Sequence, residues 1–189
     1  MKKIIHIITG LRDGGAEGAL YRLVSYDSNM HYVISLTSRG KYYRLLKENG
    51  VQVVCLNIKG FFSLIRAIVK LVSILKHENP AVVQTWMYHA DLIGGAVARI
   101  FSNAKIVWGI RHSDHGDTTR HIRFLAFLSG KVSGWVPDKI VCCSEKAAQY
   151  HQEIGYEVGK FIIIPNGYDF DKLKAVSNAR EVLLDEEGE

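Results

Sequence analysis

The stretch Ile4–Glu17 decides the fold, and it reads IIHIITGLRDGGAE. A short β-branched run, Ile4–Ile8, precedes a glycine-containing loop, and a helical pattern begins at Ala16. Continuous apolar runs of this length are typical of parallel strands that are covered on both faces. The stretch therefore predicts a strand, a turn and a helix, which is the first unit of an α/β fold.

The same alternation continues along the chain. Further strands are predicted at 32–36, 51–56, 81–85, 105–110, 139–143 and 161–164. Helices are predicted at 16–26, 41–49, 61–78, 89–101, 118–132 and 144–154. Ser144 is a typical N-cap residue, and Asn49-Gly50 and Gly155 are typical helix stops. Because connections between parallel strands are right-handed, the pattern predicts a doubly wound, Rossmann-like and mostly parallel seven-stranded sheet.

Composition is that of a folded globular domain. The chain has 189 residues, of which 48% are hydrophobic and 23% are charged, so a wholly disordered chain, a collagen and a coiled coil are excluded. It has 24 Lys and Arg against 19 Asp and Glu, and five of the acidic residues lie in the last nine positions. The first 180 residues therefore carry ten more basic than acidic groups. A body this basic is expected to attract phosphates, nucleotides or an anionic lipid surface.

Cysteine content and hydropathy indicate the compartment. Cys55, Cys142 and Cys143 are an odd number without framework spacing, so free thiols in a reducing compartment are expected. The first residues show no signal peptide pattern. The longest apolar segment, 61–75, is interrupted by Arg66 and Lys70 and is too short to span a bilayer. The sequence predicts a cytoplasmic protein, with peripheral contact at the inner face of the membrane left open.

Ligands of open α/β sheets bind beyond the carboxyl ends of the strands, so the loops that follow the predicted strands hold the candidate ligand-binding residues. After the first strand, Gly14 and Gly15 would let a backbone approach a phosphate at a helix N-terminus. The spacing fits neither a dinucleotide-binding fingerprint nor a P-loop, and a plain tight turn is the alternative. After the second strand, Ser38-Arg39 could meet the extra phosphate of NADP, which keeps an NADP oxidoreductase as a remote alternative.

Aromatic residues follow the fourth predicted strand. Trp86 and Tyr88 could offer flat faces to a sugar ring or a base, and His89 stands at the start of the next helix. The alternative is that one of these aromatic side chains packs in the core and the other caps the helix.

The densest group of titratable residues follows the fifth predicted strand. His112 is the candidate for handling a proton, and Arg111 for binding a phosphate. His112, Asp114, His115 and Asp117 are residue types that bind metals, but their spacing matches no metal motif, so no metal is expected. A solvated surface loop is the alternative.

The segment 118–136 alternates basic and apolar residues. Arg120, His121, Arg123 and Lys131 are interleaved with leucine and phenylalanine. Either the segment is a basic amphipathic helix that touches lipid, or it covers the sheet with a solvated basic edge. No DNA- or RNA-binding motif is present, so no nucleic-acid partner is expected.

Four segments read together carry a family resemblance. They are 10–17 (GLRDGGAE), 84–91 (QTWMYHAD), 108–114 (WGIRHSD), and 141–145 (VCCSE) followed by 164–169 (IPNGYD). In this order and spacing they resemble the N-terminal domain of the retaining glycosyltransferases of the GT-B fold, family 4 (glycosyl transferases group 1). The resemblance covers residues 1–173.

The resemblance implies an enzyme of two Rossmann-like domains that face each other across a cleft. Residues 1–173 would be the acceptor-side domain and 174–189 a polar linker or tail, with the C-terminal donor-binding domain absent. Gly14, Gly15 and Glu17 would form the loop beside the donor phosphates or the acceptor, and His112 would lie near the transferred sugar. The predicted acceptor-binding residues are Trp86, Tyr88, His89, Arg111, Ser113 and Asp114.

The family's pattern also sets expectations for the reaction. The donor would be a UDP- or GDP-sugar, the acceptor a glycan or lipid-linked molecule of cell-surface polysaccharide or lipopolysaccharide synthesis, and no metal or other cofactor is expected. The family often has Arg where this chain has Gly18, so a contact of that arginine is missing here. Glu181 and Glu189 have the spacing of the family's donor-binding glutamates but lie in a polar tail. The chain alone is expected to be inactive, and a non-catalytic nucleotide- or anionic-lipid-binding module is the main alternative.

Overall fold

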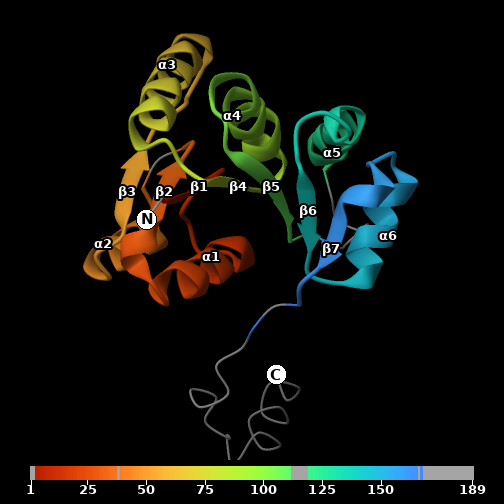
Figure 1. The fold of residues 1–189 in the computed structure, drawn as a ribbon, viewed down its shortest axis with the longest axis horizontal. Helices are drawn as coiled ribbons and strands as arrows, with labels where there is room; N and C mark the ends of the chain where they lie inside the picture. The colour runs from red at the N-terminus through yellow and green to blue at the C-terminus, as the bar shows by residue number, and fades with distance from the viewer. Residues whose placement is uncertain (1–2, 38, 112–118, 166, 168–189) are drawn as a thin grey trace, which may run out of the picture.

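The computed structural model describes residues 3–37, 39–111, 119–165 and 167. Within them the strands form one sheet in the order β3-β2-β1-β4-β5-β6-β7, and every neighbouring pair is parallel (Figure 1). The strands are β1 (Ile4–Ile8), β2 (His31–Ser35), β3 (Gln52–Cys55), β4 (Val82–Trp86), β5 (Lys105–Ile110), β6 (Lys139–Cys142) and β7 (Phe161–Ile163).

Helices cover both faces of the sheet (Figure 1). On one face lie α1 (Gly15–Ser25) and α2 (Lys41–Glu48). On the other face lie α3 (Phe61–Glu78), α4 (Ala96–Phe101), α5 (Arg120–Val132) and α6 (Glu145–Glu153). The predicted doubly wound, Rossmann-like α/β fold is therefore confirmed, and it is parallel throughout the described sheet.

The predicted element boundaries agree closely with the structure. Each strand begins and ends within one residue of its predicted bounds, because each is a β-branched run between polar or glycine-containing turns. Ser144 caps α6 as predicted, since its Oγ accepts a hydrogen bond from the Ala147 N–H at 3.2 Å. Gly50 and Gly155, with φ of 77° and 98°, follow the ends of α2 and α6 in the left-handed conformation that favours glycine.

One predicted helix, 89–101, differs from the structure. It begins as a π-helix, Ala90–Gly95, and continues as α4. A Cβ on Gly94 would come within 2.7 Å of Ile7 Cγ2, and one on Gly95 within 2.8 Å of Trp108 Nε1. The two glycines thus let the widened turn pack directly on the sheet. π-helical turns are rare and often lie at functional sites.

Two apolar cores fill the spaces between the sheet and its helices. Ile7, Leu71 and Trp108 belong to the core under α3 and α4, and Ile8 and Leu20 belong to the core under α1. The strands have buried side chains on both faces, as their continuous apolar sequences predict.

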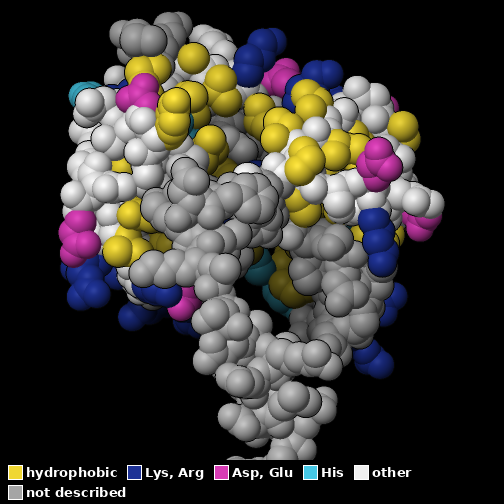
Figure 2. All heavy atoms as spheres, turned by 90° about the horizontal axis from the view of Figure 1, so that it is seen from below, with side chains coloured by type: hydrophobic (Ala, Val, Ile, Leu, Met, Phe, Trp, Pro, Cys, Tyr) yellow, Lys and Arg dark blue, Asp and Glu magenta, His cyan; other side chains and the backbone are white. Residues whose placement is uncertain are grey.

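The order of the strands reverses at β1, which pairs with β2 on one side and with β4 on the other. The connections therefore leave β1 and β4 toward opposite faces, and this leaves a crevice at the carboxyl ends of these strands. Seen from below, the molecule has a hollow between two groups of hydrophobic side chains (Figure 2). Among the described residues, no helix has the length and hydropathy needed to cross a bilayer.

Candidate functional site

The loop between β1 and α1 is held in place by the segment that follows β2. The backbone N–H and the Oγ of Thr37 both donate to the carbonyl of Thr9, at 3.0 and 2.8 Å. Gly40 lies against the same loop, because a Cβ there would come within 2.8 Å of Arg12 N. The loop that was predicted to meet a ligand is thus fixed by its neighbour before any ligand binds.

Gly14, Gly15 and Glu17 lie together at the start of α1. Gly14 is the N-cap residue, and a Cβ on it would lie 2.5 Å from a carboxylate oxygen of Glu17. The carboxylate of Glu17 therefore already lies against the first turn, where negative charge is favoured. A Cβ on Gly15 would meet nothing within 4 Å. Gly15 is thus the position at which the backbone of this loop is open to a ligand.

Arg111 follows β5 and is half-buried. Its guanidinium lies over the ring of Trp86, with 5.0 Å between Cζ and the ring centroid. Burial lowers the pKa of Arg111 below its usual value, Cys143 raises it, and the neighbouring Arg22 lowers it again. Arg111 stays charged at neutral pH, since a guanidinium does not lose its proton in proteins. Arg22 and Arg111 line the same pocket near the carboxyl end of β5, and two cationic groups beside one pocket favour an anion there.

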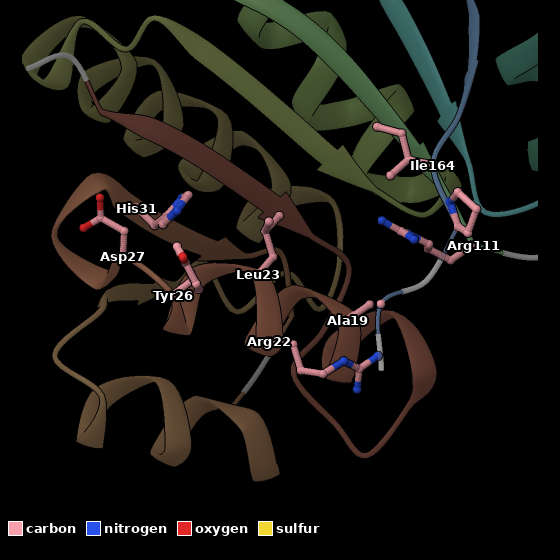
Figure 3. Close-up of a pocket in the computed structure, with 10 residues that line it drawn as sticks. Ala19, Arg22, Leu23, Tyr26, Asp27, His31, Arg111 and Ile164 are labelled. Carbon is pink, nitrogen blue, oxygen red and sulfur yellow. The ribbon is translucent and has the colours of Figure 1, made fainter. Parts of the chain in front are cut away.

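A pocket of about 550 Å³ runs along α1. Figure 3 shows Tyr26, Asp27 and His31 at one end and Arg111 at the other, with Arg22 of α1 between them. Its described lining residues also include Ala19, Leu23, Ile164, Pro165 and Gly167. Of the predicted site residues that the structure describes, Arg111 alone lines this pocket.

Trp86 and Tyr88 are buried, so neither ring offers a face to a sugar in this structure. Trp86 packs among the side chains under α1, and its Nε1 donates to His6 Nδ1 at 3.2 Å. The hydroxyl of Tyr88 lies 2.7 Å from Nε2 of His151, and burial raises its pKa. Both side chains thus take the core-packing role that the sequence left open as an alternative.

The ring of His6 links Trp86 to His31. Trp86 Nε1 can only donate, so Nδ1 of His6 is the acceptor and the proton of His6 lies on Nε2. Nε2 of His6 is 2.9 Å from Nδ1 of His31, which must then accept. Burial, together with the smaller effect of the neighbouring His31, lowers the pKa of His6 to about 3. The neutral forms of both rings therefore fit this chain of hydrogen bonds.

His89 lies next to α5. Its Nε2 is 3.4 Å from Nε2 of His121, near the start of that helix. Burial lowers the pKa of His89, and the proximity of His121 lowers it again. The contact between these two histidines could not be predicted from the sequence, in which they are 32 positions apart and His121 belongs to the basic segment 118–136.

Other predicted residues lie outside the described part of the chain. They are His112, Ser113, Asp114, His115 and Asp117 after β5, and Ser38 after β2. The neighbour of Ser38, Arg39, lies over the ring of Tyr43 at 4.8 Å. Within the described ranges, no group of three or more His, Cys, Asp or Glu could hold a metal ion.

Arg22, His6 and His31 were missed by the sequence reasoning. Arg22 lies one turn of α1 beyond Gly18, and a Cβ on Gly18 would come within 3.5 Å of its Nη1. A basic residue four positions after a loop glycine was a signal that could have been used, because i and i+4 share a helix face. The His6–Trp86 contact carried no local signal, since the two residues are 80 positions apart.

The fold and this site define a class of protein. It is a doubly wound α/β domain with a glycine-containing loop after its first strand and with two arginines that line a pocket at the carboxyl ends of its strands. The sequence makes the family specific: residues 13–172 match Glycosyltransferase Family 4. The chain belongs to this family and has the fold of a GT-B N-terminal domain.

Solved structures with the same fold support this assignment. Anabaena HepE, in complex with UDP-glucose, superposes with a TM-score of 0.80 at 14% identity, over 98% of this chain and 50% of HepE. A glycosyltransferase from Rickettsia africae ESF-5 gives 0.66 at 15% identity, over 98% of this chain and 50% of its own. The lipopolysaccharide outer core galactosyltransferase WaaB gives 0.64 at 12% identity, over 88% and 46%.

The chain therefore spans about half the length of these solved structures. At these identities the likeness concerns the fold alone. A search among curated proteins finds no match to the sequence.

Proposed function

We propose that the chain is the acceptor-side half of a retaining glycosyltransferase. The enzyme would transfer a hexosyl group from a UDP- or GDP-sugar to a glycan or lipid-linked acceptor in the synthesis of a cell-surface polysaccharide or lipopolysaccharide. Family membership supports a glycosyltransferase. The half-length match and the nucleotide-sugar in the HepE structure support a second domain that binds the donor.

The observation that carries the proposal is the approach of Arg22 and Arg111 beside a pocket at the carboxyl end of β5. A diphosphate is the anion that a nucleotide-sugar brings to such a crevice, and guanidinium groups bind phosphate oxygens in a fork geometry. Gly15, open at the start of α1, adds backbone N–H groups at a helix N-terminus. Donor phosphates would thus be bound from the first-domain side by the carboxyl edge of this sheet.

The reaction would depend on positioning and charge stabilisation. The acceptor hydroxyl would attack the anomeric carbon on the face from which the nucleoside diphosphate leaves, and the leaving phosphate would take the hydroxyl proton. His112 would hydrogen-bond a hydroxyl of the transferred sugar, and Arg111 would stabilise the negative charge that develops on the leaving group. This scheme uses no protein nucleophile, metal or other cofactor. His89, Ser113 and Asp114 remain proposed acceptor contacts.

Membership of a glycosyltransferase family favours a transferase over the NADP oxidoreductase. A cytoplasmic location, where nucleotide-sugars are available, belongs to the proposal. A non-catalytic module that binds an anionic lipid surface is the second candidate, and the exposed faces of α3 and α5 favour it.

Two steps test the proposal. The first is to read the gene beyond Glu189, where the proposal expects a second α/β domain. The second is to assay the longer protein, beside the 189-residue chain, for release of nucleoside diphosphate from UDP- and GDP-sugars and to determine the anomeric configuration of the product. Release by the longer protein with retention supports the proposal. Equal release of nucleoside diphosphate by the 189-residue chain would contradict the two-domain account. If the gene encodes no second domain, or if the longer protein releases no nucleoside diphosphate, the non-catalytic binding module is favoured instead.

A further inference from the structure

Two histidine rings from different elements face each other at the carboxyl edge of the sheet. His89 follows β4 and precedes the π-helix, and His121 is the second residue of α5. Their Nε2 atoms are 3.4 Å apart and their ring centroids 5.5 Å apart, so the rings meet through these nitrogens and do not stack. His89 is half-buried and His121 is exposed, so the pair can be reached from solvent.

The distance between these two nitrogens suits a shared metal ion better than a hydrogen bond. A nitrogen donor and its acceptor usually lie about 2.7–3.2 Å apart. Two ligand nitrogens at about 2.0–2.1 Å from one tetrahedral ion are instead separated by roughly 3.4 Å. The rings of His89 and His121 therefore already have the spacing of two ligands of one ion.

A second histidine pair in the chain shows the difference. Nε2 of His6 lies 2.9 Å from Nδ1 of His31, which is an ordinary hydrogen-bond distance. Nδ1 of His6 accepts from Trp86, and the ring of His6 is buried. Both nitrogens of His6 are thus used within the core. The buried pair is a link in a hydrogen-bond chain, whereas the pair at the start of α5 opens to solvent.

The turn that carries His89 is fixed by its neighbours. Met87, two residues earlier, has φ of 71°, a conformation that residues other than glycine seldom adopt. The carbonyl of Met87 accepts from the Asp91 N–H at 3.0 Å, and the carboxyl of Asp91 accepts from Thr85. Unusual backbone of this kind and π-helical turns both gather at functional sites, where the fold holds a side chain in one place. The backbone at His89 is therefore set before any ligand binds.

From this geometry we propose that His89 and His121 bind one divalent transition-metal ion, of the class of Zn²⁺, through their Nε2 atoms, with water completing the coordination. Each ring can do so when its proton is on Nδ1. Imidazole nitrogen suits zinc, copper and nickel, whereas magnesium and calcium prefer oxygen. Two protein ligands hold an ion less tightly than the four of a structural zinc site, and the adjacent Arg120 oppose a cation. The ion is therefore exchangeable.

An ion at this pair would join two elements beside the candidate site. It would link the turn after β4 to the first turn of α5, which contacts the π-helix. The next step rests on the proposed function, in which His89 contacts the acceptor. A metal-bound Nε2 can neither donate to an acceptor hydroxyl nor accept from it. The ion would thus inhibit transfer and take no part in the reaction.

The test is calorimetric titration of the 189-residue chain with zinc chloride, in a buffer that contains a phosphine reductant and no chelator. We expect one ion per chain at the tightest site. His89→Gln and His121→Gln should each lower this affinity at least about tenfold, since each removes one of two ligands. Two controls should keep it. They are His77→Gln, which removes an exposed histidine of α3, and Cys143→Ser, which removes a half-buried thiol.

A rescue experiment separates metal binding from packing. His121→Cys exchanges one zinc ligand for another and should bind zinc, whereas the polar side chain in His121→Gln should not. Zinc should raise the temperature of thermal unfolding for the unsubstituted chain and His121→Cys, and leave it unchanged for His121→Gln. Equal unfolding of these chains without zinc shows that their fold is intact. Electron paramagnetic resonance of bound Cu²⁺ should detect two coordinating imidazoles in the unsubstituted chain and one in His121→Gln.

Three results would overturn the metal site. They are no saturable binding of zinc, full zinc affinity in both His89→Gln and His121→Gln, and an equal loss of affinity in His77→Gln. Any of these outcomes is independent of transfer, because the titration uses the 189-residue chain without a sugar donor.

The proposed transferase is assayed separately, as release of nucleoside diphosphate by the longer protein without zinc. Added zinc should then inhibit the unsubstituted protein, and His121→Gln should be insensitive to it. Release without zinc binding would reject the metal site alone, and zinc binding without release would reject the enzyme alone. Release that continues while zinc occupies the pair would reject the inhibitory role.

Discussion

The guanidinium of Arg111 lies over the indole of Trp86, with Cζ 5.0 Å from the ring centroid. Trp86 is completely buried and is hydrogen-bonded to His6 beneath it. The orientation of the guanidinium is therefore set by a ring that cannot move without disturbing the core. A group held in this way by packed neighbours is suited to binding a ligand at low entropic cost.

Replacing Arg111 should weaken the binding of anions by the chain. We expect Arg111→Gln to lower the affinity for UDP about tenfold or more, because a charge-assisted hydrogen bond contributes roughly 1.5–3 kcal/mol. Arg111→Lys should recover only part of the affinity, since it keeps the charge but neither the fork nor the stacking. Calorimetric titration with UDP measures both. Arg44→Gln, on the exposed side of α2, is the control, and an unchanged affinity in Arg111→Gln would remove Arg111 from the site.

The buried His6 should make the domain less stable in acid. The pKa of His6 is about 3 in the folded chain and near 6.5 in the unfolded chain. Between these values the unfolded state binds more protons, so stability is lost as the pH falls from 6.5 toward 3, by up to about 1.4 kcal/mol per pH unit. In His6→Asn the side chain keeps an acceptor for Trp86 but does not titrate. Urea unfolding at pH 7, 6 and 5 should show a weaker loss in this variant.

The control for that experiment is His77→Gln, because the side chain of His77 is mostly exposed at the end of α3. It should follow the unsubstituted chain at each pH. If His6→Asn loses stability with acid as steeply as the unsubstituted chain, His6 is not the group responsible. Burial also lowers the pKa of His31, so a double variant with His31→Asn should flatten the dependence further.

Asp91 acts with the opposite sign. It is a buried residue of the π-helix, accepts a hydrogen bond from Thr85 Oγ1 at 2.5 Å, and has its pKa raised well above the usual value by burial. The folded chain therefore keeps the proton that the unfolded chain loses near pH 4, and this contribution to stability falls as the pH rises. Asp91→Asn keeps the acceptor and cannot ionise. Relative to the unsubstituted chain, its free energy of unfolding in urea should improve between pH 5 and 8, and a difference that does not change with pH would contradict the assignment.

The fold could be predicted from the sequence because its signals are local. The run Ile4–Ile8 and the run Lys105–Ile110 are apolar over the full length of β1 and β5, and their predicted bounds match the structure. The π-helix could not be predicted, since a helical period does not distinguish it from an α-helix. Its formation depends on Gly94 and Gly95 meeting Ile7 and Trp108, which are distant in sequence or on other elements.

The candidate site was predicted only in part for the same reason. Gly14 and Gly15 lie in the loop from the first strand to the first helix, so their place near the crevice could be predicted from the sequence. The burial of Tyr88 depends on His151, 63 positions later, and the sequence contains no sign of that pair. The hydrogen bond of Trp86 is likewise made to His6, which lies 80 positions away in the sequence. For Trp86 and Tyr88 the residue type therefore suggested contact with a ligand, whereas the structure shows that both side chains pack against neighbours from distant segments of the chain.

His112 remains a prediction from the sequence and its family resemblance. In the longer protein, His112→Ala should lower turnover at least about tenfold, since a hydrogen bond that strengthens in the transition state would be lost. The substrate affinity and the thermal unfolding should change little. Steady-state release of nucleoside diphosphate gives kcat and KM separately. Unchanged kcat would remove His112 from the reaction.

Gly15 separates the folding role of the β1–α1 loop from its proposed binding role. A Cβ at this position meets nothing in the free domain, and alanine is a better helix former than glycine at the start of α1. Gly15→Ala should therefore fold at least as stably as the unsubstituted chain, by up to about 1 kcal/mol. If a phosphate approaches this backbone, the added methyl should nevertheless weaken UDP binding.

Two glycines make the comparison decisive. A Cβ on Gly60 also meets nothing, but Gly60 precedes α3 and lies outside the proposed site, so Gly60→Ala should leave UDP binding unchanged. A Cβ on Gly40 would collide with the backbone at Leu11 and Arg12, so Gly40→Ala should lower the free energy of unfolding by about 1–3 kcal/mol. Calorimetric titration ranks the three variants by their affinity for UDP, and urea unfolding ranks them independently by their free energy of unfolding. Gly15→Ala should stand apart as the variant that is stable yet binds weakly, and full UDP affinity in Gly15→Ala would show that the loop is a turn and nothing more.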